Sequence, residues 1–189
     1  MKHTIRYLAS AVCLAVLSAF NAQAADDLQT ESKLAIEAFK KTDSALATFF
    51  ENAAGYAVFP NVGKGGLVVG GARGKGLVYE KRQITGDATM TQASIGAQAG
   101  GQTFAEVIFF ETPNALNDFK AGNFEMSAEV SAVAAAEGAS KAAKYKHGVA
   151  VFTLPKKGLM VQATIGGQKF KFHPATLEPT GRPSPKTNQ

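Results

Sequence analysis

A stretch from Ala54 to Tyr79 constrains the fold more than any other part of this chain. It holds eight of the 19 glycines, interleaved with Val, Leu, Phe and Tyr. Glycine reaches backbone conformations and close approaches that other residues cannot, but it weakens a strand interior because it has no side chain to pack. This stretch therefore predicts a sheet with tight turns, bulges or another element packed closely over it.

The glycines do not form either common phosphate-binding loop. The Walker pattern requires GxxxxGK followed by Ser or Thr, but Val69 stands at its first glycine and Gly76 at its hydroxyl position. The dinucleotide pattern GxGxxG fails because its third glycine is replaced by Val68 in one candidate and by Tyr79 in the other. Such loops need backbone N–H groups at fixed offsets, so we interpret the glycines as architectural.

Residues 1–24 have the pattern of a secretory signal peptide. A basic start precedes an apolar core from Leu8 to Phe20, and Ala22-Gln23-Ala24 is an A-x-A cleavage site. The core is shorter than the about 20 residues of a lasting transmembrane helix, so a retained anchor is the less favoured alternative. Cys13 lies inside this core without the flanking residues of a lipidated cysteine. We expect cleavage after Ala24 and a periplasmic protein.

Cleavage would leave 165 residues (25–189), a usual length for one domain. The mature chain would contain no cysteine, which excludes thiol catalysis and cysteine metal sites. Its formal charge would fall from +5 to +3. That excess permits a basic patch but is too small for a nucleic-acid-binding surface, so we expect no nucleic-acid partner.

Apolar residues recur at three- and four-residue steps from Leu28 to Ala54, which predicts an amphipathic helix. Asp43 is placed to split it and to cap a second short helix. We favour a helix that lies on its own sheet. The alternative is a helix on a membrane surface, whose lipid contacts would be Phe39, Phe49 and Phe50.

Strands and turns are predicted from Tyr56 to Phe110, with turns at Gly74, Gly86-Asp87 and Gly100-Gly101. Three further elements are expected. Val107 to Phe110 is apolar on both faces, so this strand should be covered on both sides. Thr112-Pro113 opens a helix that Gly122 closes. Val149 to Ile165 should form a hairpin, and Gln168 to Phe172 an edge strand whose lysines oppose sheet association. Residues 174–189 are predicted to form a disordered, proline-rich tail.

The mature chain offers little for catalysis, which needs a nucleophile, an acid–base pair or a metal. His147 and His173 are its only histidines, and no GxSxG or HExxH motif occurs. We therefore expect no enzyme, no cofactor and no metal.

What remains is a set of cations beside apolar residues. The candidate headgroup-binding residues are Lys64, Arg73, Lys75, Lys81 and Arg82, which we place on or near turns. A second basic set lies near the last hairpins: Lys156, Lys157, Lys169 and Lys171. One interpretation is that both sets are ordinary solvated surface charges without a binding role. In the functional interpretation, Arg73 and Lys75 flank a tight turn at Gly74 and bind one phosphate together.

Three motifs in order resemble the SYLF domain family. They are Gly55-Tyr56-Ala57-Val58-Phe59-Pro60 with the glycine pairs after it, the Gly/Gln block from Ser94 to Gln102, and the strand pair that includes Val149 to Leu154 and Lys157-Gly158-Leu159-Met160. The similarity spans residues 28–172 and indicates a stand-alone bacterial member, with a SYLF-like domain over residues 25–173. It also favours a strand over a helix for Phe124 to Glu137, where the sequence pattern is ambiguous.

The resemblance implies lipid binding, since eukaryotic SYLF domains bind phosphoinositide membranes through basic residues and an N-terminal amphipathic helix, and fungal relatives also bind actin. A periplasm has neither actin nor, ordinarily, phosphoinositides, so only lipid binding carries over and the natural lipid stays open. We predict one α+β domain with a curved, largely antiparallel Gly-rich sheet and a few helices. Its expected function is non-catalytic binding of anionic phospholipid at the periplasmic face of the envelope. The alternative is a protein–protein scaffold or envelope-maintenance module that does not depend on lipid, with an unidentified envelope protein as partner.

Overall fold

The computed structural model describes residues 25–66, 69–95, 102–122, 124, 126, 132–157 and 167–175. The predicted signal peptide, the turn at Gly100-Gly101, the second half of the hairpin predicted up to Ile165 and almost all of the predicted tail lie outside these residues.

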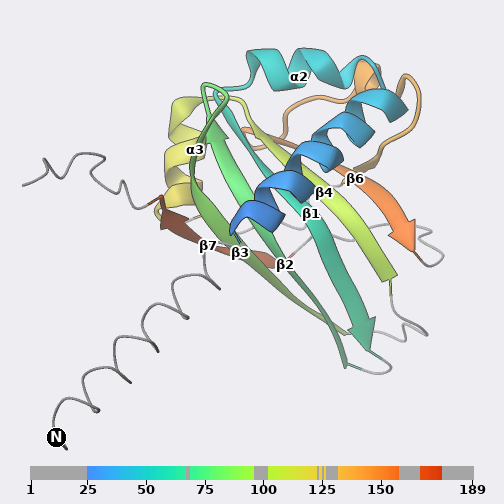
Figure 1. The fold of residues 1–189 in the computed structure, drawn as a ribbon, viewed down its shortest axis with the longest axis vertical. Coiled ribbons are helices and arrows are strands. Elements are labelled where there is room, and N and C mark those ends of the chain that lie inside the picture. The colour runs from blue at the N-terminus through green and yellow to red at the C-terminus, as the bar shows by residue number, and fades with distance from the viewer. Residues whose placement is uncertain are drawn as a thin grey trace, which may run out of the picture.

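The core of the fold is one seven-stranded sheet with the order β5-β6-β4-β1-β2-β3-β7 (Figure 1). All neighbours pair antiparallel except β5 and β6. The strands are β1 (Gly55–Gly66), β2 (Val69–Glu80), β3 (Gln83–Ile95), β4 (Gln102–Phe110), β5 (Val133–Ala134), β6 (Val149–Lys157) and β7 (Gln168–Pro174). With its helices, the sheet confirms the predicted single α+β domain, and β7 is an edge strand as predicted.

Helices flank the sheet, and all but the short 3-10 turn lie where the sequence predicted helices. Residues 25–42 form an N-terminal helix, followed by α2 (Leu46–Asn52); α3 (Pro113–Lys120) and a short 3-10 turn, η1 (Ala139–Ala142), come later. Asp43 lies at the break between the first two helices, where its carboxylate accepts hydrogen bonds from the backbone N–H of Ala45 at 3.1 Å and of Ser140 at 2.7 Å. The N-cap of α2 is Ala45, without a side-chain cap, so the predicted capping by Asp43 was wrong. Thr112 caps α3 by accepting the N–H of Ala115 at 3.2 Å.

Both faces of the sheet are buried at β4, as its continuous apolar run predicted. Val107 and Phe109 point to one face, where the N-terminal helix and α2 cover them, and Ile108 and Phe110 point to the other, beneath α3. Figure 1 shows the N-terminal helix crossing the first face diagonally. Each face therefore has its own apolar cluster, and β4 belongs to both.

A hydrogen bond across the sheet shows how strongly it curves. The side-chain Nε2 of Gln168, on β7, donates to Glu106 Oε2, on β4, at 3.0 Å. In a flat sheet β4 and β7, four strand spacings apart, would be separated by about 19 Å. The face that carries Glu106, Ile108 and Phe110 is therefore concave, and the face beneath the N-terminal helix is convex. This confirms the predicted curvature.

The predicted turns at Gly74 and at Gly86-Asp87 were wrong, because these residues lie within β2 and β3. Instead, these glycines allow atoms of neighbouring residues to pack closely against the strand. A Cβ at Gly76 would lie 2.5 Å from the carbonyl oxygen of Val58 and 2.6 Å from the ring of Phe59. The actual turn between β2 and β3 is Lys81-Arg82.

Only Val133–Ala134 is a strand within the described part of Phe124 to Glu137. The predicted strand is thus reduced to two residues there, which pair in parallel with Phe152 and Thr153.

Replacing Gly76 by Ala should lower the free energy of unfolding by about 1–3 kcal/mol, because the added methyl group overpacks the contact between β1 and β2. Gly63→Ala is the matched control on the neighbouring strand, since a Cβ there would meet nothing within 4 Å. Urea denaturation of both variants measures the difference. Equal stability of the two variants would contradict the close-approach role of Gly76.

The buried carboxyl group of Glu106 should make stability depend on pH. Burial raises the pKa of Glu106 to about 7, and the hydrogen bond from Gln168 offsets only part of that rise. Between the ordinary pKa of about 4.5 and about 7, the folded state keeps a proton that the unfolded state releases. The free energy of unfolding should therefore fall as the pH rises through this window, by on the order of 3 kcal/mol.

Glu106→Gln should remove this slope and leave the variant more stable than the wild type at pH 8. Urea denaturation between pH 4.5 and 8 measures both slopes. Glu37→Gln, at an exposed position of the N-terminal helix, is the control and should keep the wild-type slope. Parallel curves for wild type and Glu106→Gln would show that Glu106 is not the group responsible.

Candidate anion-binding site

The described residues contain no group of three or more metal-ligating side chains. Both predicted histidines lie at the surface: His147 is exposed in a turn, and His173 Nδ1 lies 3.0 Å from Asp87 Oδ2 at the edge strand. No helix in the described part of the chain is long and apolar enough to cross a bilayer. The candidate binding residues in the described part of the chain are therefore its cations.

Lys64 does not belong with the other predicted residues, because it points to the concave face. A bulge between Phe59 and Val62 inserts an extra residue into β1 and turns the later residues of the strand to the opposite face. Lys64 pairs with Ala72 of the concave cluster and is only 6% exposed. Burial lowers the pKa of its amino group.

Lys81 and Arg82 form the two-residue turn between β2 and β3, with φ of 49° and 67°. Such turns normally use Asn or Gly, because a left-handed backbone costs other residues roughly 1–2 kcal/mol each. Both side chains line a cavity of about 350 Å³ together with Tyr56 and Phe50. The turn is about 20 Å along the strand from Lys75, so these two cations form a separate surface.

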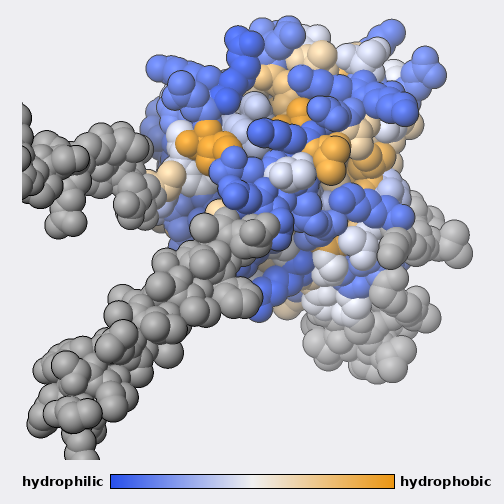
Figure 2. Space-filling view, in the orientation of Figure 1, coloured by the Kyte–Doolittle hydropathy of each residue, from blue (hydrophilic) through white to orange (hydrophobic). Residues whose placement is uncertain are grey.

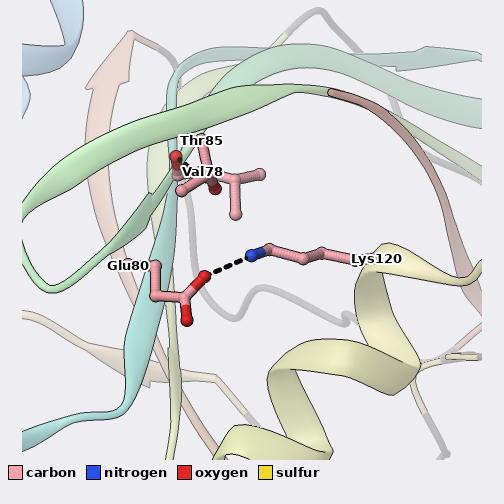
Figure 3. Close-up of polar contacts among 4 residues, drawn as sticks. All are labelled: Val78, Glu80, Thr85 and Lys120. Carbon is pink, nitrogen blue, oxygen red and sulfur yellow. Dashed lines mark hydrogen bonds and ion pairs between the residues drawn. The ribbon is translucent and has the colours of Figure 1, made fainter. Parts of the chain in front are cut away.

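The strand beside this turn is tied to α3. Lys120 Nζ lies 2.6 Å from Glu80 Oε2, and the Thr85 hydroxyl donates to the carbonyl oxygen of Val78 at 3.4 Å (Figure 3). The salt bridge to Lys120 lowers the pKa of the Glu80 carboxyl group.

Arg73 and Lys75 lie two residues apart within β2, so the tight turn predicted around Gly74 was wrong. Their side chains do point the same way, because alternate residues of a strand share a face. Both are exposed, on the convex face. Two adjacent cations therefore do point outward together, as the hypothesis requires. They do so because alternate residues of a strand share a face, and no turn is involved.

Strand pairing brings further polar residues to these two cations. Arg73 lies opposite Thr91, which lies opposite Lys169; Lys75 lies opposite Thr89, which lies opposite Lys171. Directly opposed residues of antiparallel strands share one face. We call these two rows the basic platform: Arg73, Lys75, Thr89, Thr91, Lys169 and Lys171. Its four cations and Thr91 are exposed, and Thr89 is half-buried.

The surroundings of the basic platform are mixed in charge. Lys156 Nζ donates to Asn61 Oδ1 at 2.9 Å, beside Lys75. Lys75 also borders a groove of about 580 Å³ between the start of the N-terminal helix and the sheet, where Asp27 and Glu31 lie. Figure 2, which views the side covered by the N-terminal helix, shows hydrophilic residues over much of this surface, with several hydrophobic areas among them. The exposed cations of the platform make its own part of the convex face polar.

The side chains of the predicted membrane-contact residues pack inside the protein. Phe39 is 0% and Phe50 4% exposed, inside the convex cluster. Phe49 is half-buried, with its ring 5.3 Å from Phe109 and 5.2 Å from Phe152. In this arrangement the helices lie on their own sheet, and these side chains are not presented to lipid.

The sequence interpretation placed Lys169 and Lys171 in a separate basic set, although they share a face with Arg73 and Lys75. The alternation Lys169-Phe170-Lys171-Phe172 did show that both lysines point away from the core. The strand order that seats β7 next to β3 is what the sequence pattern could not provide.

Fold and surface together define an α+β domain whose convex face carries exposed cations where β2, β3 and β7 lie side by side. Residues 91–176 match the family Ysc84, described as "Las17-binding protein actin regulator". The chain is also 34% identical over 138 residues to Beta cell expansion factor A of Aeromonas veronii, a match that covers 71% of this chain and 51% of that protein. It thus spans about half the length of this relative.

Both matches agree with the similarity to the SYLF family that the sequence motifs indicated. That family consists of non-enzymatic binding domains, and the similarity supports a lipid-binding domain.

Proposed function

We propose that this domain binds anionic phospholipid at the periplasmic face of the cell envelope without catalysing a reaction. The observation that carries the proposal is the basic platform, where strand pairing gathers four exposed cations on one face. Phosphate groups of a membrane surface present the complementary charge, and β2, β3 and β7 hold the cations in a fixed arrangement.

The size of the electrostatic attraction fits reversible association. Each Lys or Arg near an anionic surface contributes about 1 kcal/mol, so the platform would contribute about 4 kcal/mol, equivalent to a dissociation constant near 1 mM. Tighter binding would need additional cations or apolar contacts. Lys156, beside the platform, is the nearest candidate.

The alternative function, a protein scaffold, would use the same surface without dependence on lipid charge. The lipid proposal is favoured because the platform consists of four cations and two threonines, without an aromatic side chain, whereas the core of a protein interface is enriched in aromatic residues and depleted of charge. Its periplasmic location rests on the secretory pattern of residues 1–24.

Reversing both charges of β2 (Arg73→Glu with Lys75→Glu) should weaken binding to anionic vesicles by about 2 kcal/mol or more, roughly thirtyfold. Binding to neutral vesicles should hardly change. Co-sedimentation at low salt measures both, after circular dichroism has shown that the variant is folded.

The matched control is Lys81→Glu with Arg82→Glu, which changes the net charge equally at the far end of the same strand. It should bind anionic vesicles more tightly than the platform variant does. Equal losses in the two variants would show attraction to net charge without a defined site. Unchanged binding in the platform variant would exclude Arg73 and Lys75 as headgroup ligands.

Export predicts a specific mature N-terminus. The A-x-A pattern should direct cleavage between Ala24 and Ala25, and the periplasmic protein should begin at Ala25. Mass spectrometry of the protein from a periplasmic extract measures this. A diacylglyceryl group on Cys13, or a retained Met1, would contradict a cleaved and released species.

A further inference from the structure

The threonines between the cations give the basic platform a feature that electrostatic attraction alone does not require. Thr91 lies between Arg73 and Lys169, and Thr89 between Lys75 and Lys171, each directly opposite its neighbours. Sheet geometry places the cations of one row about 10 Å apart across β3, with Cα atoms of the two rows about 7 Å apart. The two hydroxyl groups thus occupy the middle of a rectangle of cations.

We propose that the basic platform recognises a terminal phosphate, that is, a phosphate monoester, in preference to a phosphate diester. This deepens the proposed function and rests on it. The shared chemistry is a phosphate group with three unesterified oxygens, which a lipid headgroup or a soluble phosphate ester can supply.

The donor set matches this group in number and charge. Each threonine hydroxyl can donate one hydrogen bond, each lysine amino group three, and the Arg73 guanidinium can bind two oxygens at once. A phosphate monoester carries a charge of about −1.5 to −2 at neutral pH and offers three acceptor oxygens. A diester carries only one negative charge and two unesterified oxygens, so it leaves more of these donors unused.

The flanking positions leave the centre of the rectangle open. On the β1 side Arg73 lies opposite Gly63, which has no side chain to cover it. On the other side the next row is Leu77, Asp87 and His173, where the carboxylate of Asp87 is engaged by His173 at 3.0 Å. The platform rows themselves contain no carboxylate; Asp87 lies in the next row, and Asp27 and Glu31 lie in the groove that Lys75 borders.

The decisive comparison uses vesicles that contain phosphatidic acid, a monoester, and vesicles that contain phosphatidylglycerol, a diester, matched for surface charge. Wild-type protein should bind the phosphatidic acid vesicles about tenfold more tightly, since hydrogen bonds to charged groups are the strong ones. Thr89→Val with Thr91→Val keeps the branched shape that suits a strand and retains all four cations. This variant should lose the preference, because its affinity for phosphatidic acid vesicles should fall about tenfold further than its affinity for phosphatidylglycerol vesicles.

Three outcomes separate the inference from the function on which it rests. If the wild type binds both vesicles equally, or if the valine variant keeps the preference, recognition of the monoester is overturned, although anionic lipid binding stands. If the wild type binds neither vesicle, both proposals fail. Lys169→Gln with Lys171→Gln should weaken binding to both vesicles; no change in this variant would remove β7 from the site and overturn the four-cation arrangement.

Competition with glycerol 3-phosphate distinguishes the two sources of the phosphate. Displacement of the protein from phosphatidic acid vesicles at millimolar ester would show that the platform binds the phosphate group by itself. A preference that persists without displacement would show that the phosphate is recognised only at a lipid surface. Either result, with the preference abolished by the valine substitutions, supports recognition of a terminal phosphate.

Discussion

Burial of both faces of β4 is the constraint on which the rest of the structure depends. Its alternating side chains require one cover over Val107 and Phe109 and another over Ile108 and Phe110. The N-terminal helix and α2 provide the first cover and α3 the second. These covers are confined to part of the sheet, because neither apolar cluster includes the platform positions of β2, β3 and β7. The outer parts of β2, β3 and β7 on the convex face are left to polar residues, and this is where the basic platform lies.

The sequence could predict elements whose cause is local. The split at Asp43 and the start of α3 at Thr112 follow from side chains that bond to nearby backbone groups, and both were predicted correctly. The turns were not predicted correctly, because glycine can mark either a turn or a close contact within a strand, and the sequence does not distinguish these two uses. At Gly76 it allows Phe59 to pack against the strand, whereas the true turn at Lys81-Arg82 uses residues that disfavour the required backbone.

The candidate site was predicted in part, for reasons that lie in strand order and register. Arg73 and Lys75 share a face because they are two residues apart, a relation that any strand preserves. Lys64 was assigned to the same surface, but the bulge after Phe59 turns it to the opposite face. Lys169 joins Arg73 only through pairing of β3 with β7, nearly one hundred residues later in the chain. Helical periodicity likewise could not decide whether Phe39 meets a sheet or a membrane, because both require the same apolar stripe.

The placement of cations on strands rather than in loops bears on the kind of recognition that this surface can provide. Flexible basic segments attract any anionic surface, since their charges adjust to whatever they meet. Side chains on paired strands start from fixed Cα positions, and the opposed residues of β2, β3 and β7 cannot change their spacing without breaking the sheet. A rectangle of cations with hydroxyl groups at its centre can therefore favour anions by the number and spacing of their acceptors, because the sheet sets the Cα positions even though the lysine side chains themselves are flexible.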